Sequence, residues 1–237
     1  MNDPTLSGDN TDFSFDAIYR GDSPFGDHAP WDIDGPQPSY VALEAAGLIT
    51  GDVLDSGCGT GDNALYLASK GHPVTGIDSA PTAIDIARCK AAERGLPATF
   101  DTADALELPG YHAQFDTVID SALAHLFTTD ELTRYAAALH RACRPGATVH
   151  VLAISDRATA FIRTGHAELA EQMEAQLSDG NLDLNEMLPS LTAHQLRTGF
   201  ADDWATESLT ETTLRAHLPF QPDPINLPAW LARFRRL

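Results

Sequence analysis

The chain has 237 residues, of which 43% are hydrophobic, and a formal net charge of -19 at pH 7. This length and composition predict one compact α/β domain with an apolar core. So large a negative charge repels phosphate backbones and anionic lipid headgroups, and we therefore expect neither nucleic acid nor a membrane surface as a partner. The acidity either favours a cationic ligand or simply keeps the protein in solution.

The three cysteines, Cys58, Cys89 and Cys143, are widely spaced. Such a set forms no disulfide framework and no metal-ligand pair, so we expect no bound metal. The sequence has no secretory signal pattern and no apolar run long enough to cross a bilayer, and we expect a cytoplasmic protein. No pattern in the sequence predicts the oligomeric state.

The N-terminal part is irregular. Residues 1–12 are polar and rich in turn formers, which predicts a loose tail before a single domain over residues 13–237. Residues 13–20 are expected to form a short helix, and the rest of segment 13–38 a Gly- and Pro-rich loop that acts as a lid or cavity wall. A further helix is predicted over residues 39–48.

From residue 52 onward, strand and helix patterns alternate. The predicted strands cover residues 52–57, 72–78, 97–104, 115–121 and 147–155, and the predicted helices cover 63–71, 80–95 and 128–146. The last of these helices opens with the capping box Thr128-x-x-Glu131. This alternation predicts a Rossmann-like, doubly wound and mostly parallel sheet with helices on both faces. Ligands bind such sheets along the edge where the strands end.

The pattern is weaker after residue 156. Residues 157–191, which include a predicted helix over 160–180, are expected to form a variable insertion on the substrate side. A second capping box, Thr192-x-x-Gln195, opens another helix. Strands over 203–210 and 228–237, the latter antiparallel, would complete a seven-stranded sheet.

The first predicted strand runs into a glycine-rich turn, VLDSGCGTGDNALYLA. Glycines allow the backbone to turn sharply and approach a ligand closely. A dinucleotide-binding loop has a small residue at its sixth position, where this chain has Asp62. Asp62 and Asp55 would repel a pyrophosphate but suit the amino group and sulfonium of S-adenosylmethionine. We therefore predict S-adenosylmethionine as cofactor, bound by Asp55, Gly57, Cys58 and Gly59.

The other cofactor-binding candidates follow the next three strands: Asp78 and Ser79, Asp104 and Ala105, and Asp120 and Ser121. An acid after the second strand can accept both ribose hydroxyls. The pair after the third strand can meet the adenine, and the pair after the fourth lies beside the methionine portion and the methyl group. Each acid alone is more commonly a helix cap or turn residue, but four at successive strand ends predict a single site.

Residues 40–155 resemble class I S-adenosylmethionine-dependent methyltransferases. The resemblance is carried by VLDSGCGTG, GIDSAP, TADALELP, FDTVIDS and the RPG before the fifth strand. It implies a Rossmann-like fold and methyl transfer to an acceptor that these motifs do not identify.

A narrower resemblance covers AIYRGDSPFGDHAPWDIDGPQPSY, which is similar to the N-terminal segment of thiopurine-methyltransferase-like proteins. The segments DSALAHLF and AWLARFRR also resemble bacterial members, so this resemblance extends over most of the chain. That group includes thiol, halide and small-phenol methyltransferases. Their pattern PWDIGxPQP reads PWDIDGPQP here, so one glycine has shifted by a position. The resemblance implies that Trp31 lines the cavity, where an indole can attract a sulfonium by a cation–π interaction. The alternative is that Trp31 fills a gap in the core.

Two residues are candidates for catalysis. His125 follows the fourth strand and could take a proton from a phenol or thiol, or it could be structural. Tyr19 could add a hydroxyl to the same cavity. We expect methyl transfer to an oxygen, sulfur or nitrogen nucleophile of a small aromatic or heterocyclic molecule. The alternatives are a thiol, halide or tellurite methyltransferase without a general base, a non-catalytic cofactor-binding protein, and a nicotinamide-dependent oxidoreductase.

Overall fold

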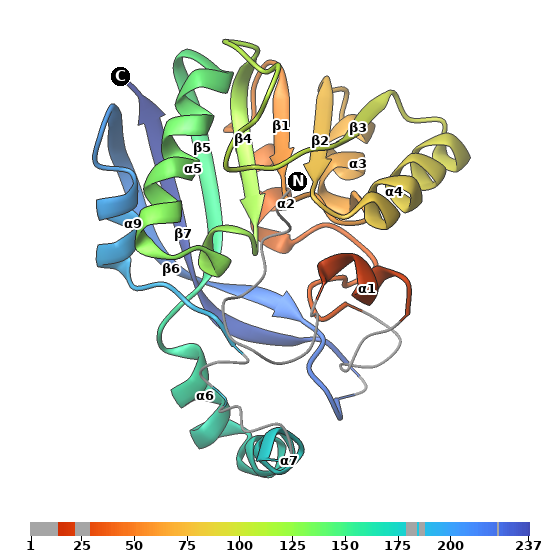
Figure 1. The fold of residues 1–237 in the computed structure, drawn as a ribbon, viewed down its shortest axis with the longest axis vertical. Coiled ribbons are helices and arrows are strands. Elements are labelled where there is room, and N and C mark those ends of the chain that lie inside the picture. Colours follow the sequence, from red (N-terminus) through yellow and green to blue (C-terminus); the bar gives the residue numbers. More distant parts are fainter. Residues whose placement is uncertain (1–13, 22–28, 179–183, 185–187, 222) are drawn as a thin grey trace.

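The computed structural model describes residues 14–21, 29–178, 184, 188–221 and 223–237. Seven strands form one mixed sheet in the order β3-β2-β1-β4-β5-β7-β6 (Figure 1). They are β1 Val53–Ser56, β2 Val74–Asp78, β3 Ala98–Thr102, β4 Phe115–Ser121, β5 Cys143–Ile154, β6 Trp204–Ala216 and β7 Ile225–Arg236. The predicted tail, 1–12, lies outside the described residues.

The direction of the strands differs between the two halves of the sheet. The four pairings that join β3, β2, β1, β4 and β5 are parallel. The two pairings of β7, with β5 and with β6, are antiparallel. The Rossmann-like α/β fold with seven strands is therefore confirmed, whereas the prediction of a mostly parallel sheet holds only from β3 to β5. Because β7 enters between β5 and β6, it reverses the pairing at that edge.

Helices cover both faces of the sheet (Figure 1). They are α1 Phe15–Tyr19, α2 Pro38–Ala45, α3 Asp62–Ser69, α4 Pro81–Arg94, the 3-10 helix η1 Ala124–Leu126, α5 Thr129–Ala142, α6 Ala158–Gly165, α7 Ala167–Ser178 and α9 Ala193–Gly199. Successive strand residues point to opposite faces. Accordingly Val53 packs into the core beneath α2, α3 and α4, while Leu54 packs into the core beneath α5 and α9. Each face of the sheet thus has its own buried core.

Several predicted boundaries move. Helix α5 ends at Ala142, because Pro145 and Gly146 belong to an irregular start of β5, where the register to β4 shifts. The predicted helix over 160–180 is divided into α6 and α7 by His166, whose backbone leaves the helical region. Both capping boxes are confirmed.

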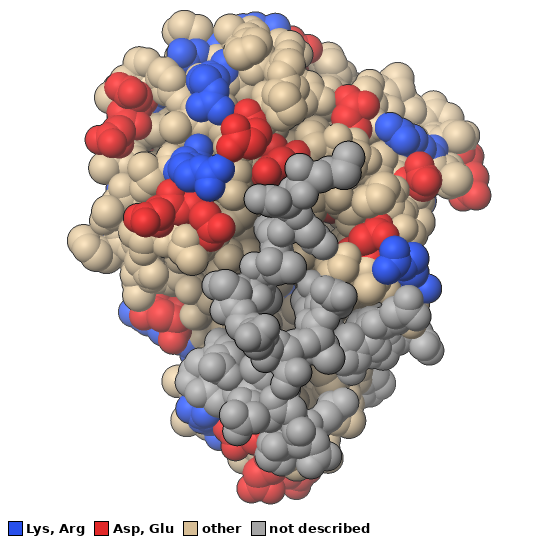
Figure 2. Space-filling view, in the orientation of Figure 1, with Lys and Arg blue, Asp and Glu red and all other residues tan. Residues whose placement is uncertain are grey.

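The parallel pairing brings the carboxyl ends of β1 to β4 to one edge of the sheet. Helix α1, the far part of the β6–β7 hairpin, and α6 and α7 lie on this side (Figure 1). None of the helices in the described part of the chain is long and apolar enough to cross a membrane. On the face drawn in Figure 2, basic side chains stand next to acidic ones.

Candidate active site

The loop between β1 and α3 follows a path that only glycines tolerate well. Gly57, Gly59 and Gly61 have φ of 71°, 52° and 86°. A Cβ on Gly59 would lie 2.8 Å from the Tyr19 hydroxyl, and a Cβ on Gly61 would lie 2.9 Å from the Phe100 ring. The loop therefore turns in the left-handed region and also lies in close contact with its neighbours.

Asp55 is a buried carboxyl group beneath this loop. It is fully buried in β1, and neither of its oxygens accepts a hydrogen bond of normal geometry among the described residues, although the backbone N–H of Ala64 lies close enough to favour the ionised form. Burial, opposed by the backbone N–H of Ala64, raises the pKa of Asp55 to about 8. A buried carboxylate without a partner is costly, so this site either holds a proton or binds a cationic group.

Two further acids approach the loop from neighbouring strands. Asp78 accepts hydrogen bonds from the backbone N–H of Gly59 and of Ala80, each at 2.9 Å. Burial raises its pKa in spite of these bonds. Asp120 is buried, and burial raises its pKa to about 6. Because Asp78 is bonded to the loop itself, its position and that of Gly59 are coupled.

The turn after β4 bears backbone strain. Ala122 has a φ of 67°, in the left-handed region that residues with a Cβ rarely adopt. Asp120 Oδ1 stabilises the turn by accepting from the backbone N–H of Leu123 at 3.1 Å and of Ala124 at 3.2 Å. The Leu123 side chain consequently packs against Gly57, with 2.9 Å between its Cβ and a Cβ built there. The glycine loop and the end of β4 thus form one contiguous surface.

A small cavity lies between this surface and the N-terminal segment, a name used below for residues 14–21 and 29–37. Its volume is about 40 Å³. It is lined by Trp31, Asp32, Ile33, Gly35, Gln37, Gly57, Cys58, Gly59, Thr60, Asp62, Asn63 and Ser121. Five predicted site residues meet here, namely Trp31, Gly57, Cys58, Gly59 and Ser121. Sequence reasoning missed Asp32 and Gln37, although both lie in the PWDIDGPQP motif.

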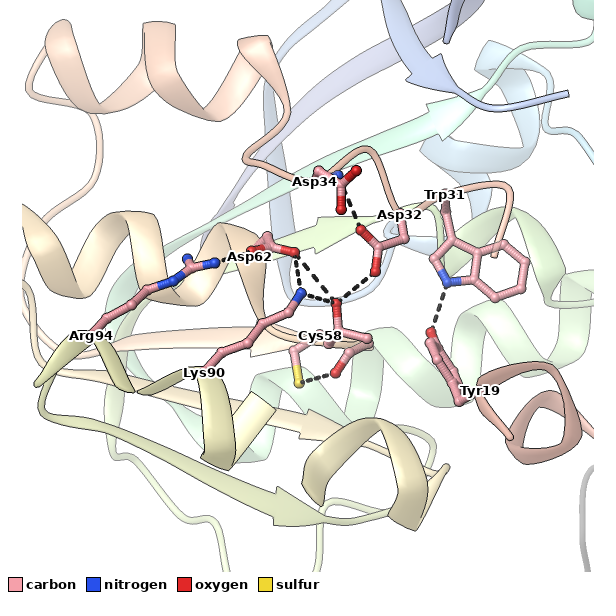
Figure 3. A network of polar contacts seen from close by, with 10 residues as sticks. Tyr19, Trp31, Asp32, Asp34, Cys58, Asp62, Lys90 and Arg94 are labelled. Atoms are coloured by element: carbon pink, nitrogen blue, oxygen red, sulfur yellow. Dashed lines mark hydrogen bonds and ion pairs between the residues drawn. The ribbon is translucent and has the colours of Figure 1, made fainter. Parts of the chain in front are cut away.

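Two aromatic residues of the N-terminal segment, Trp31 and Tyr19, lie against the glycine loop. Trp31 Nε1 donates a hydrogen bond of 2.7 Å to the Tyr19 hydroxyl, which lies over Gly59 (Figure 3). Burial and the nearby Asp78 raise the pKa of Tyr19 well above its ordinary value, so Tyr19 is protonated at neutral pH. Its hydroxyl can therefore donate a hydrogen bond but is a poor base.

Gln37 joins the same segment to two other elements. Its backbone N–H donates to Asn63 Oδ1 at 2.8 Å, which connects it to α3. Its side-chain amide donates to the Arg215 carbonyl at 2.8 Å and accepts from the Arg215 N–H at 3.0 Å. In addition, the His217 N–H donates to the Pro30 carbonyl at 2.7 Å. The far end of β6 therefore holds the N-terminal segment beside the glycine loop.

His125 has a structural contact in η1. Its side chain is buried, and its Nδ1 accepts a hydrogen bond of 3.2 Å from the Ile154 backbone N–H. Burial lowers the pKa of His125 to about 4. In this contact Nδ1 is unprotonated, so the ring proton of the neutral form is on Nε2, and no ring nitrogen is free to accept another. His125 is also not among the residues that line the cavity. Of its two interpretations, the geometry favours the structural one.

Ser79, Asp104 and Ala105 are among the candidates that lie outside the cavity lining. Asp104 and Ser79 are exposed, and Asp104 Oδ1 accepts from the Leu106 N–H at 2.8 Å, as in an ordinary turn. Ala105 is partly buried in the same turn. Their assignment to the cofactor remains a prediction.

The role expected for Asp62 is corrected. Its carboxylate lies 2.7 Å from Lys90 Nζ and 3.3 Å from an Arg94 nitrogen (Figure 3). Two basic groups on α4 thus neutralise its charge. Asp62 therefore supplies no free negative charge to a ligand, and the binding of a cationic ligand by Asp55 remains a prediction.

The residues present fit S-adenosylmethionine. Asp55 offers an unpartnered carboxyl group for a cationic ligand, and Gly57 and Gly59 form a cradle that a Cβ would fill. Asp78 lies at the end of β2, where a ribose can be bound. Trp31 presents its indole to the cavity. Within the described ranges, no three His, Cys, Asp or Glu side chains are grouped to hold a metal ion.

Comparisons with known proteins agree with this geometry. The family model described as "Methyltransferase domain" matches residues 53–146. A 2-heptyl-1-hydroxyquinolin-4(1H)-one methyltransferase of Mycobacteroides abscessus is 44% identical over 147 residues, which cover 61% of this chain and 65% of that protein. An uncharacterized methyltransferase of Schizosaccharomyces pombe is 34% identical over 48% of this chain and 79% of that protein.

Solved structures extend the similarity to most of the chain. The structure described as "Conversion of a Disulfide Bond into a Thioacetal Group during Echinomycin Biosynthesis" has 53% identity and a TM-score of 0.82, and the match covers 94% of this chain and 90% of that one. Magnesium protoporphyrin IX methyltransferase from Synechocystis PCC 6803, with bound SAH, has 20% identity, a TM-score of 0.60 and coverages of 84% and 80%, which supports the fold alone. The chain therefore belongs to the S-adenosylmethionine-dependent methyltransferases and uses S-adenosylmethionine as its cofactor.

Proposed function

We propose that this enzyme methylates a sulfur atom of a small heterocyclic molecule. One observation carries the choice of sulfur: the 53% identity, over 94% of the chain, to the structure described by the conversion of a disulfide into a thioacetal. The Mycobacteroides relative, which is named for a hydroxyquinolinone, matches a smaller share of this chain at lower identity. Both names indicate small-molecule acceptors.

The chemistry of the site supports an acceptor that brings no proton to the transfer step. The two candidate bases are poorly suited, because His125 uses Nδ1 for the Ile154 contact and Tyr19 is protonated. A thiolate, thioether or disulfide sulfur attacks with a lone pair and needs no base for this step. The new bond forms between that sulfur and the methyl carbon. The old carbon–sulfur bond breaks, and its electron pair leaves with S-adenosylhomocysteine.

The residues of the site contribute mainly alignment. S-adenosylmethionine supplies the methyl group as a sulfonium, which is already a good leaving group. Well-oriented reactants can gain up to ~7–11 kcal/mol from positioning alone. Trp31, on the N-terminal segment, and Ser121, at the end of β4, both line the cavity and are suited to help position the reactants. Asp55, Asp78 and the glycine loop would hold the cofactor, with Asp104 and Ala105 at the adenine.

A second candidate function is methylation of a hydroxyl group on a nitrogen heterocycle. It is favoured by the name of the Mycobacteroides relative. This reaction removes a proton from an acidic hydroxyl, which can be ionised before it binds. The grouping with thiopurine-methyltransferase-like proteins, carried by residues 17–40, remains an expectation that would agree with a sulfur acceptor.

The test is an acceptor panel with methyl-labelled S-adenosylmethionine. The panel contains cyclic disulfides, aryl thiols, a hydroxyquinolinone, phenols, iodide and tellurite. Transfer to sulfur compounds, with S-adenosylhomocysteine released in equal amount, is the expected result. Transfer to hydroxyl acceptors alone would contradict the sulfur assignment and support the second candidate.

A further inference from the structure

A chain of polar contacts crosses the glycine loop from α4 to the N-terminal segment (Figure 3). Lys90 Nζ lies 2.7 Å from Asp62 Oδ2 and 2.8 Å from Thr60 Oγ1. Thr60 Oγ1 in turn lies 2.8 Å from Asp32 Oδ2. The side chains of Lys90 and Asp62 are only 24% and 9% exposed, and Thr60 is buried. These contacts are therefore shielded from solvent more than an ordinary surface ion pair.

The chemistry of the groups fixes the direction of the bonds. The Lys90 ammonium can only donate, so the Thr60 oxygen must accept from it. The single hydroxyl proton of Thr60 then goes to a carboxylate. Asp32 is at 2.8 Å, whereas Asp62 is at 3.4 Å and already accepts from Lys90. The proton of Thr60 is consequently directed to Asp32.

We propose that Lys90 is a positioning residue that latches the N-terminal segment over the cofactor loop through Thr60 and Asp32. The inference deepens the proposed function and rests on it only for the use of the cofactor site. Lys90 has two effects in this arrangement. It orients the Thr60 hydroxyl toward Asp32, and together with Arg94 it neutralises Asp62, which would otherwise repel the approaching Asp32 carboxylate.

The contacts from Lys90 through Thr60 to Asp32, called the latch below, lie where the N-terminal segment meets the cavity. Asp32 directly follows Trp31, whose indole lines the cavity and binds the Tyr19 hydroxyl. The contacts of Gln37 with Asn63 and Arg215 hold the segment to α3 and β6. Asp32 instead holds it to the glycine loop itself. Without Lys90, the segment would keep its attachment to β6. The Thr60 hydroxyl, however, could turn its proton to the uncompensated Asp62 carboxylate, and its bond to Asp32 would weaken.

The experiment is a calorimetric titration with S-adenosylhomocysteine, which needs no methyl acceptor. Lys90→Met and Asp32→Asn should each weaken binding about tenfold, as expected for a shielded, charge-assisted contact. The double variant should lose little more than either single variant, because both break the same latch. Lys90→Arg should recover much of the affinity. Lys70→Met, at the only other lysine of the chain, is the matched control and should bind like the parent protein.

Variants of Thr60 test the same contact independently, in case a variant of Lys90 or Asp32 unfolds. Thr60→Val removes the hydroxyl at constant shape and should weaken binding as Asp32→Asn does, while Thr60→Ser retains it and should bind normally. Unchanged affinity in Lys90→Met, or losses that simply multiply in the double variant, would overturn the latch. Because no acceptor is present, a wrong assignment of sulfur leaves these results unaffected, so the two proposals fail separately.

Discussion

The two halves of this molecule differ in the direction of their strands and in the residues that they bring to the site. The half built from β3, β2, β1 and β4 is parallel, and its strand ends carry the glycine loop, Asp55, Asp78 and Asp120. The other half consists of the N-terminal segment, α6, α7 and the antiparallel β6–β7 hairpin. The family model matches residues 53–146, which lie almost entirely in the first half. We therefore expect the parallel half to hold the cofactor, and we propose that the other half, which lies mostly outside the family match, selects the acceptor.

The largest expected effect tests the close packing of the parallel half. Gly59→Ala should weaken S-adenosylhomocysteine binding more than 100-fold, because its Cβ would lie 2.8 Å from the Tyr19 hydroxyl and fill the cofactor cradle. Gly71→Ala is the control, since Gly71 also has a positive φ, 94°, but a Cβ there would meet no atom within 4 Å. Gly71→Ala should lose about 1 kcal/mol of stability through backbone strain, and Gly59→Ala should lose stability through its contact with Tyr19 as well. Equal cofactor affinity in the two variants would contradict the cradle.

The next effect concerns the buried acid. Asp55→Asn should weaken binding of the cationic S-adenosylmethionine by about 1.5–3 kcal/mol. Because burial raises the pKa of Asp55 to about 8, the parent protein must release a proton to offer a carboxylate. Cofactor affinity should accordingly rise between pH 6 and pH 8 in the parent and stay flat in the variant. Calorimetry in buffers of different ionisation enthalpy measures the released proton.

The same substitution has the opposite effect on stability. The folded-state pKa of Asp55 is raised, so the folded protein binds more protons than the unfolded chain between about pH 4 and pH 8, and stability falls as the pH rises through this range. Asp55→Asn removes this term. The variant should therefore be more stable than the parent at pH 8 in urea unfolding, and a loss of stability there would argue that Asp55 has a partner.

His125 gives an effect of intermediate size. Its folded-state pKa is lowered to about 4 from an ordinary value near 6.5, so the unfolded chain binds the proton more readily. This contribution to stability is present above pH 6.5 and is lost as the pH falls toward 4, by up to about 3 kcal/mol. His125→Gln should flatten the acid side of the stability curve. The variant should also lower the rate of methyl transfer to all acceptors by a similar factor. A loss confined to protonated acceptors would instead show that His125 acts as a general base.

The smallest effect concerns two helices, α5 and α9, that pack in the same core beneath one face of the sheet. Thr128→Ala removes the cap of α5 and Thr192→Ala the cap of α9, and each should cost about 1 kcal/mol of unfolding free energy. Neither should change cofactor affinity by more than about twofold, because neither residue reaches the cavity. A large loss of activity in Thr192→Ala, without one in Thr128→Ala, would show that α9 also contributes to function.

The sequence predicts the parallel half more completely than the other half. Alternating strands and helices with strong caps determine local structure, so the glycine loop and the acids at the strand ends can be located without coordinates. Asp62 shows the limit, because its partners Lys90 and Arg94 are about 30 residues away along the chain and meet it only after folding. His125 has the same difficulty, since its burial and its Ile154 contact follow from tertiary packing. Residues 157–178 have too little periodicity for α6 and α7 to be separated in advance.

A competition between two acceptors tests most directly whether the enzyme prefers sulfur. The enzyme would receive methyl-labelled S-adenosylmethionine and equal concentrations of a small cyclic disulfide and 2-heptyl-1-hydroxyquinolin-4(1H)-one, with the label in each product measured over time. The ratio of labelling rates gives the ratio of kcat/KM. We predict a ratio of at least about tenfold in favour of sulfur, a difference of about 1.4 kcal/mol in transition-state stabilisation. Preferential labelling of the hydroxyquinolinone would contradict the account.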